Sequence, residues 1–280
     1  MRVYISVDIE GATGIVSFSQ CGRPDGSCYD FAFARRMLTH DVNAAIRGAR
    51  AAGAEYMLVK DSHATNKNLL IDELEDGTEL LSGIGSGTMG MMEGLDASFD
   101  VVFLVGYHGM AGAPASILEH ALAGGVHRFW INGSEAGEIA ASAGVAGSFG
   151  VPTLLVTSDD AGCHEARAAL PGVHTFSTKT GLGRFMGRLK HPSVTGPGIE
   201  AAAKAAVENR AAVAPYRCPE PTTMRVQFRT VEEADLAATL TETVRPDAYS
   251  VEWTRPTFLL AHQVAYNVFM LSIQGRRMGA

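Results

Sequence analysis

The chain has 280 residues, of which 46% are hydrophobic and 19% are charged, with a formal net charge of −7. This length and apolar content are sufficient for one large domain or two smaller ones that share a core. The acidic balance argues against nucleic acid as a partner, and no apolar run reaches the roughly 18 residues that span a bilayer. The N-terminus enters a strand without the layout of a signal peptide, so we expect a soluble cytoplasmic protein.

The first half of the chain alternates strand-like and helix-like segments. Apolar runs typical of buried strands occur at residues 2–10, 55–61, 78–84, 100–108, 126–131 and 152–160. A helix is expected at about 30–52, where Leu38, Val42 and Ile46 recur at helical spacing and Gly53 provides a stop. A second helix is expected from about Glu135 to Ser148. This alternation predicts an α/β fold with a mostly parallel sheet and flanking helices.

The last part of the chain has a different character. After a helix at about 198–213, the segment APYRCPEPT (214–222) holds three prolines and indicates a boundary. Residues 223–230 and 249–254 alternate apolar and polar side chains, which predicts half-buried antiparallel strands. Helices are expected at about 231–240 and 256–272, the second being apolar on nearly all sides and therefore a core or interface helix. We predict an α/β domain at 1–214 with a smaller α+β C-terminal unit at 215–280 packed on it.

Carboxylate and imidazole side chains follow several of the predicted strands. The candidates are Asp8 and Glu10 on one face of the first strand, His63 after the second, His108 after the strand at 100–108, and Glu135 and Glu138 in the first turn of a helix. In open α/β sheets, ligands bind beyond the carboxyl ends of the strands. We therefore expect these side chains to meet at one place.

Buried carboxylates are costly without a partner, and a metal ion is a suitable one. Mixed imidazole and carboxylate ligands suit zinc, with manganese or iron as alternatives. Five ligands exceed what one catalytic zinc with an open position takes, so the pattern favours two ions. Taken singly, each residue has another interpretation: Asp8 as a loop cap, His63 as a surface histidine, His108 as a core histidine, and Glu138 as a favourable charge at a helix N-terminus.

Several motifs resemble those of one known family. SVDIEG (6–11), DSHATN (61–66), VGYHGMAG (105–112), EHAL (119–122) and NGSEAGE (132–138) occur in the order and spacing of the zinc-dependent D-aminopeptidases, the DppA-type family whose members are often labelled dipeptide transport proteins. The resemblance covers most of the chain, including KTGLGR at 179–184.

This resemblance implies a ligand set and an assembly. Two zinc ions per subunit would be held by Asp8 as the bridge, Glu10, His63, His108 and Glu138, with Glu138 preferred to Glu135 because its distance from His120 fits the family better. His120 would be the catalytic nucleophile or base, although Glu119 stands where the family more often has Asp. The family also implies ring-like homo-oligomers, namely decamers.

The expected activity is hydrolysis of the N-terminal residue from short peptides, with D-amino acids such as D-Ala-D-Ala implied by the resemblance. A zinc-activated water would attack the amide, and His120 would move a proton or attack directly. Two other classes stay open. One is a different dinuclear hydrolase, such as an amidase or phosphoesterase. The other is a non-catalytic peptide-binding protein of a transport system, against which the absence of a signal peptide counts.

Overall fold

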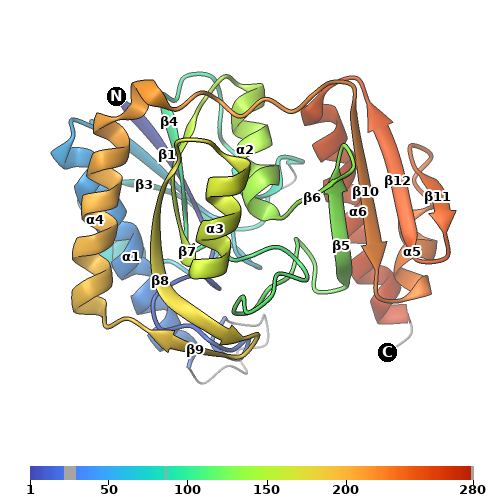
Figure 1. Cartoon of the computed structure of the whole chain (residues 1–280), viewed down its shortest axis with the longest axis horizontal. Coiled ribbons are helices and arrows are strands. Elements are labelled where there is room, and N and C mark those ends of the chain that lie inside the picture. The colour runs from blue at the N-terminus through green and yellow to red at the C-terminus, as the bar shows by residue number, and fades with distance from the viewer. Residues whose placement is uncertain (22–29, 86, 279–280) are drawn as a thin grey trace.

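The computed structural model describes residues 1–21, 30–85 and 87–278. A seven-stranded sheet forms the larger part of the fold (Figure 1), in the order β3-β2-β1-β4-β7-β8-β9. Its strands are β1 (Arg2–Val7), β2 (Tyr56–Asp61), β3 (Glu79–Leu81), β4 (Val101–Val105), β7 (Thr153–Asp159), β8 (His174–Gly183) and β9 (Met186–Leu189). Neighbouring strands run parallel except for the β8–β9 hairpin. The predicted α/β fold with a mostly parallel sheet is confirmed.

Helices cover both faces of this sheet (Figure 1). Helices α1 (Phe31–Ala51) and α4 (Pro192–Glu208) share one apolar cluster with Ile5 of β1, whereas α2 (Glu138–Ser148) and α3 (Asp160–Ala169) belong to a second cluster with Tyr4. Successive residues of β1 thus point to opposite faces, as a strand requires. The helices α1 and α4 approach closely, because a Cβ atom at Gly48 would lie 2.2 Å from the carbonyl oxygen of Glu200.

A second sheet of antiparallel strands lies beside the first, in the order β11-β12-β10-β5-β6. Its strands are β5 (Val126–Ile131), β6 (Ser134–Glu135), β10 (Thr222–Phe228), β11 (Val244–Asp247) and β12 (Ser250–Arg255). The two predicted C-terminal strands are therefore confirmed as antiparallel neighbours. Our prediction that residues 126–131 continue the parallel sheet is wrong. Val126, Phe129 and Ile131 are buried and His127 is exposed, which suits a sheet with one covered face.

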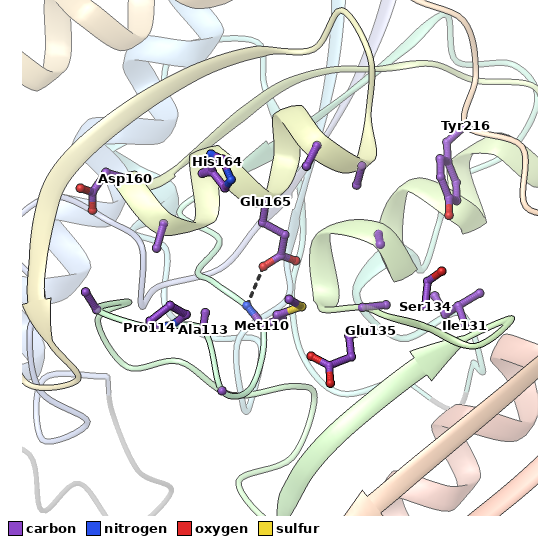
Figure 2. A pocket seen from close by; sticks show the side chains of 17 residues that line it. Met110, Ala113, Pro114, Ile131, Ser134, Glu135, Asp160, His164, Glu165 and Tyr216 are labelled. Carbon is purple, nitrogen blue, oxygen red and sulfur yellow. Dashed lines mark hydrogen bonds between the residues drawn. The ribbon is translucent and has the colours of Figure 1, made fainter.

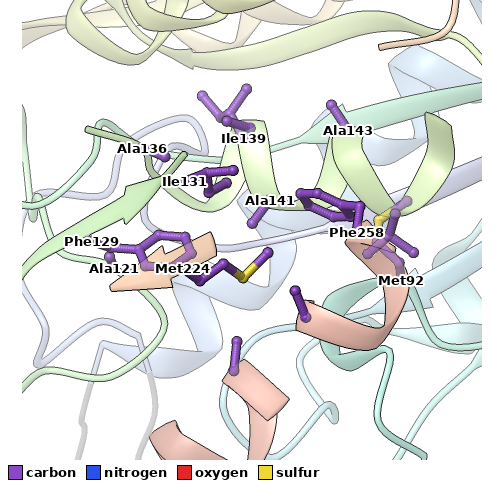
Figure 3. Close-up of a cluster of buried hydrophobic side chains, with 14 of the residues drawn as sticks. Met92, Ala121, Phe129, Ile131, Ala136, Ile139, Ala141, Ala143, Met224 and Phe258 are labelled. Carbon is purple, nitrogen blue, oxygen red and sulfur yellow. The ribbon is translucent and has the colours of Figure 1, made fainter. Parts of the chain in front are cut away.

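The apolar face of the second sheet packs on helices. Helix α6 (Phe258–Met278) places Phe269 edge-to-face against Phe129, with ring centroids 6.0 Å apart. Figure 3 shows Met224 and Phe129 of this sheet in the same cluster as Ile139 of α2. The short helix α5 (Val231–Ala237) packs against α6. Helix α6 is thus a core helix on one side, and the division into 1–214 and 215–280 stays a prediction.

Two predicted helix starts differ from the structure by three residues or more. The helix expected from Glu135 begins at Glu138, because Glu135 pairs on β6 with Trp130. The helix expected at 198–213 begins at Pro192, where proline suits the first turn and the side chain of His191 caps the N-terminus. Residues 210–212 form a separate 3₁₀ turn. Within the described residues, none of the helices is long and apolar enough to cross a membrane.

Candidate metal centre

The five predicted ligands come together at the carboxyl edge of three adjacent strands. Asp8 and Glu10 follow β1, His63 follows β2, and His108 follows β4. Glu138 reaches the same place as the first residue of α2. All are buried except His63, whose side chain is 12% exposed.

Asp8 lies between the two histidines. Its Oδ1 atom is 3.1 Å from Nδ1 of His63, and its Oδ2 atom is 3.4 Å from Nε2 of His108. Nδ1 of His63 is also 3.1 Å from Oε2 of Glu10, and Nε2 of His108 is also 3.4 Å from Oε1 of Glu138. The two oxygens of one carboxylate therefore face two separate groups of ligand atoms.

Three of the converging atoms are buried without a hydrogen-bond partner: Oδ2 of Asp8, Oε2 of Glu10 and Nε2 of His108. Nδ1 of His108 lies 3.0 Å from the carbonyl oxygen of Gly109, so a proton on Nδ1 is donated there and Nε2 is the ring nitrogen that faces the carboxylates. Orphaned acceptors are costly in a protein interior. A cation among them would satisfy all three, so the donor set fits a metal ion.

His120 lies at the edge of the same cluster, in the loop before β5. Its ring stacks on that of His108, and its Nε2 atom is 3.8 Å from Oε1 of Glu138. Two overlapping groups have ligand atoms close enough to share an ion, namely Asp8, Glu10 and His108, and His108, His120 and Glu138. The sequence singled out His120 for proton transfer, and the structure also places it within ligand distance of the second group.

Burial and charge give these groups very different proton affinities. Burial and the neighbouring charge of Glu10 raise the pKa of Asp8 to about 7. Burial raises the pKa of Glu138, but the charge of His108 outweighs this effect and lowers the pKa to about 2. Burial favours a neutral His108, yet the charge of Glu138 holds the pKa of that ring well above its ordinary value. For His120, burial and the charge of His108 both lower the pKa.

Glu135 lies outside the cluster. It is exposed on β6 and forms an ion pair with Arg128. The structure therefore favours Glu138 over the fallback Glu135, because only Glu138 faces the histidines. Glu135 lies on β6 and Glu138 begins α2, so the two glutamates belong to different elements. Because they are only three residues apart, the sequence does not show this difference.

A pocket of about 860 Å³ lies next to the cluster rather than in it. Figure 2 shows Glu165 of α3 pointing toward the loop that begins at Met110, whose main-chain N–H donates to Oε2 of Glu165 at 2.7 Å. Ala136 and Ala140, on either side of Glu138, line the same pocket, but none of the five ligand candidates does. The metal cluster and this pocket are thus separated by the loop after His108 and the start of α2.

Comparison with known proteins identifies the family of the chain. The model of the peptidase M55 family, described as D-aminopeptidase, matches residues 1–266. The chain belongs to the D-aminopeptidase family. The resemblance inferred from the motifs is thereby confirmed.

A related sequence and a solved structure extend the comparison for this member of the D-aminopeptidase family. A D-aminopeptidase of Bacillus subtilis (strain 168) is 29% identical over 269 residues, which cover 94% of each chain. The solved structure of DppA from Bacillus subtilis, described as a Zn-dependent D-aminopeptidase and a self-compartmentalizing protease, matches with a TM-score of 0.93 at 28% identity and covers 98% of each chain. The chain therefore shares the fold of the solved structure and spans nearly the whole length of both matches.

Proposed function

We propose that this protein is a zinc-dependent aminopeptidase that removes the N-terminal residue from short peptides containing D-amino acids, such as D-Ala-D-Ala. The observation that carries the proposal is the set of three orphaned atoms, on Asp8, Glu10 and His108, that face one another in a buried cluster. The Zn-dependent relative of the same fold supports zinc as the metal. Imidazole and carboxylate ligands are those that zinc accepts.

Two zinc ions would be held by Asp8, Glu10, His63, His108 and Glu138. The two oxygens of Asp8 face His63 and His108 separately, which suits a bridging carboxylate. When bound, a zinc pair polarises the scissile carbonyl and lowers the pKa of water toward neutrality. Burial of the carboxylates keeps bulk water from competing for the same positions.

His120 would carry the proton in this reaction. Nδ1 of His120 lies 2.9 Å from the carbonyl oxygen of Leu118, which fixes the ring and turns Nε2 toward Glu138. At 15% exposure the side chain is more accessible than that of His108. We propose that Nε2 accepts a proton from the attacking water and passes it to the leaving amine. Direct attack by the imidazole is the alternative, and an acyl-histidine intermediate trapped by rapid quench would reveal it.

The proposal includes a ring-like homo-oligomer, namely a decamer. The solved relative, which covers 98% of this chain, is described as a self-compartmentalizing protease. The β8–β9 hairpin exposes 52% of Leu182, 59% of Phe185 and 64% of Met186, an apolar surface that subunit contact would cover. Sedimentation equilibrium that gives only the mass of one chain would contradict this part. The cytoplasm stays the compartment predicted from the sequence.

The deciding experiment compares amine release from D-Ala-D-Ala and L-Ala-L-Ala, before chelation, after chelation and after zinc is returned. We expect only the D-dipeptide to be cut, with loss on chelation and recovery with zinc. Zinc binding without cleavage of either dipeptide would favour the amidase or phosphoesterase alternative. Peptide binding without any turnover would favour a binding protein.

A further inference from the structure

A lysine lies fully buried beside the candidate metal centre. Lys179 of β8 has no exposed surface, and its Nζ atom donates to the main-chain carbonyl oxygens of Glu10, Ala12 (2.9 Å) and Ile15 (2.6 Å). All three acceptors belong to the segment 10–15, which starts at a candidate zinc ligand. The three protons of the ammonium group are thereby all used.

This contact is unusual because a buried charge is costly unless it is paired. Among the described residues, no carboxylate lies within ion-pair distance of Lys179, so three carbonyl dipoles stabilise its charge. The carbonyls depend on the lysine in turn, since the carbonyl of Ile15 has no other main-chain donor among the described residues. Removal of the ammonium group would leave buried acceptors unpaired and release the segment.

Other groups also bind the segment 10–15. Oγ1 of Thr178 donates to the carbonyl oxygen of Gly11 at 2.7 Å, and the N–H of Thr13 donates to Oδ2 of Asp41 at 2.8 Å. Gly11 itself is pressed on the loop after β4, because a Cβ atom there would lie 1.6 Å from the carbonyl oxygen of Tyr107. Lys179 is the one of these groups that bonds the main chain of Glu10 directly.

We propose that Lys179 is a positioning residue that sets the metal-binding orientation of Glu10 by binding three carbonyls of the segment that follows it. This inference rests on the proposed function, because it takes Glu10 as a zinc ligand. Lys179 takes no part in proton transfer, because among the described residues its Nζ atom donates to main-chain carbonyls and not to a ligand side chain. Groups that orient metal ligands typically change metal affinity by about 10- to 100-fold when they are removed.

The test compares K179M with the wild type and with K190M. Methionine keeps an unbranched side chain that is one atom shorter than that of lysine, and it cannot donate a hydrogen bond. Lys190 is a matched control, because its Nζ atom also donates to a main-chain carbonyl, that of Ser177, outside the segment 10–15. We measure the dissociation constant of zinc by competition with a fluorescent chelator, and amide hydrogen exchange of residues 10–15 in the metal-free proteins.

We expect K179M to weaken zinc binding at least tenfold and to speed exchange at residues 10–15, while K190M stays within twofold of the wild type. With zinc in excess, kcat on D-Ala-D-Ala should recover and KM should stay unchanged. Wild-type zinc affinity in K179M would overturn the inference, even if its melting temperature falls. If K179M does not fold, K179Q, which retains two donors, is expected to show the same effect at smaller size.

The outcomes for this inference and for the proposed function can be told apart. A wild-type protein that binds zinc but cuts no D-peptide would defeat the substrate proposal and leave the role of Lys179 to be decided by zinc affinity. Wild-type turnover with unchanged zinc affinity in K179M would defeat the positioning role alone.

Discussion

The imidazole rings of His108 and His120 are stacked, with centroids 4.1 Å apart and an angle of 12° between their planes. In both rings, Nδ1 is hydrogen-bonded to a main-chain carbonyl oxygen. Nε2 of each ring faces Oε1 of Glu138. They differ in their other neighbours, since Asp8 lies 3.4 Å from Nε2 of His108 and forms no such ion pair with His120. Stacking thus places a residue suited to hold a metal directly beside one suited to carry a proton.

Substitution of His120 by Asn should separate these two roles. We expect H120N to lower kcat by about 10²- to 10⁴-fold, the usual contribution of a general acid or base, while zinc content stays near the wild-type value. Steady-state kinetics and elemental analysis of the purified protein check this. Loss of zinc in step with activity would instead make His120 a ligand, as its distance to Glu138 permits.

Substitution of Asp8 by Asn should remove metal and activity together. The variant keeps the shape of the side chain but loses the charge that both histidines face. We expect H108A to behave in the same way. Turnover retained in a D8N protein that elemental analysis shows to be free of metal would rule out the metal-dependent mechanism.

The two glutamates of NGSEAGE provide a matched pair. We expect E138Q to lose zinc, because Oε1 of Glu138 faces both stacked histidines. E135Q should keep zinc and activity, since the side chain of Glu135 forms an ion pair with half-buried Arg128, away from the histidines, and pairs near the surface contribute about 0 to 1 kcal/mol. Equal zinc loss in the two variants would contradict the assignment.

Glu165 should make stability depend on pH. Burial raises its pKa to about 7 from an ordinary value of 4.5, so the folded protein holds a proton that the unfolded chain has released. The contribution of this group to the free energy of unfolding is full below pH 4.5 and is lost as the pH rises to 7, by at most about 3 kcal/mol. E165Q, which still accepts from Met110, should gain stability over the wild type from pH 5 to pH 8 in urea unfolding. A pH-independent difference would show that this carboxyl is not perturbed.

Gly11 should tolerate no side chain. A Cβ atom at Gly11 would lie 1.6 Å from the carbonyl oxygen of Tyr107, whereas one at Gly183 would meet nothing within 4 Å. We expect G11A to lower the free energy of unfolding by about 1 to 3 kcal/mol or more and to weaken zinc binding, because overpacking shifts the backbone between Asp8 and the lysine-bound carbonyls. G183A is the control, with a change within about 0.5 kcal/mol.

The accuracy of the sequence predictions follows from how local each signal is. The helix α1 was predicted within one residue because its apolar face repeats over six turns. The strand at 126–131 was assigned to the wrong sheet because an apolar run indicates a strand without naming its partner. The candidate ligands could be named from strand ends, yet the sequence gives no sign that Lys179 is buried, since its acceptors are main-chain carbonyls.

The pairing of β5 with β10 joins two parts of the chain that are synthesised at different times. During synthesis, β5 and β6 emerge about ninety residues before β10, and the hairpin leads directly into Glu138 at the start of α2. Until β10 is made, the inner edge of β5 has no partner strand among the described elements. The C-terminal strands, which carry none of the candidate ligands, therefore complete the scaffold of the metal centre, and a chain that ends early should leave the ribosome without a formed site.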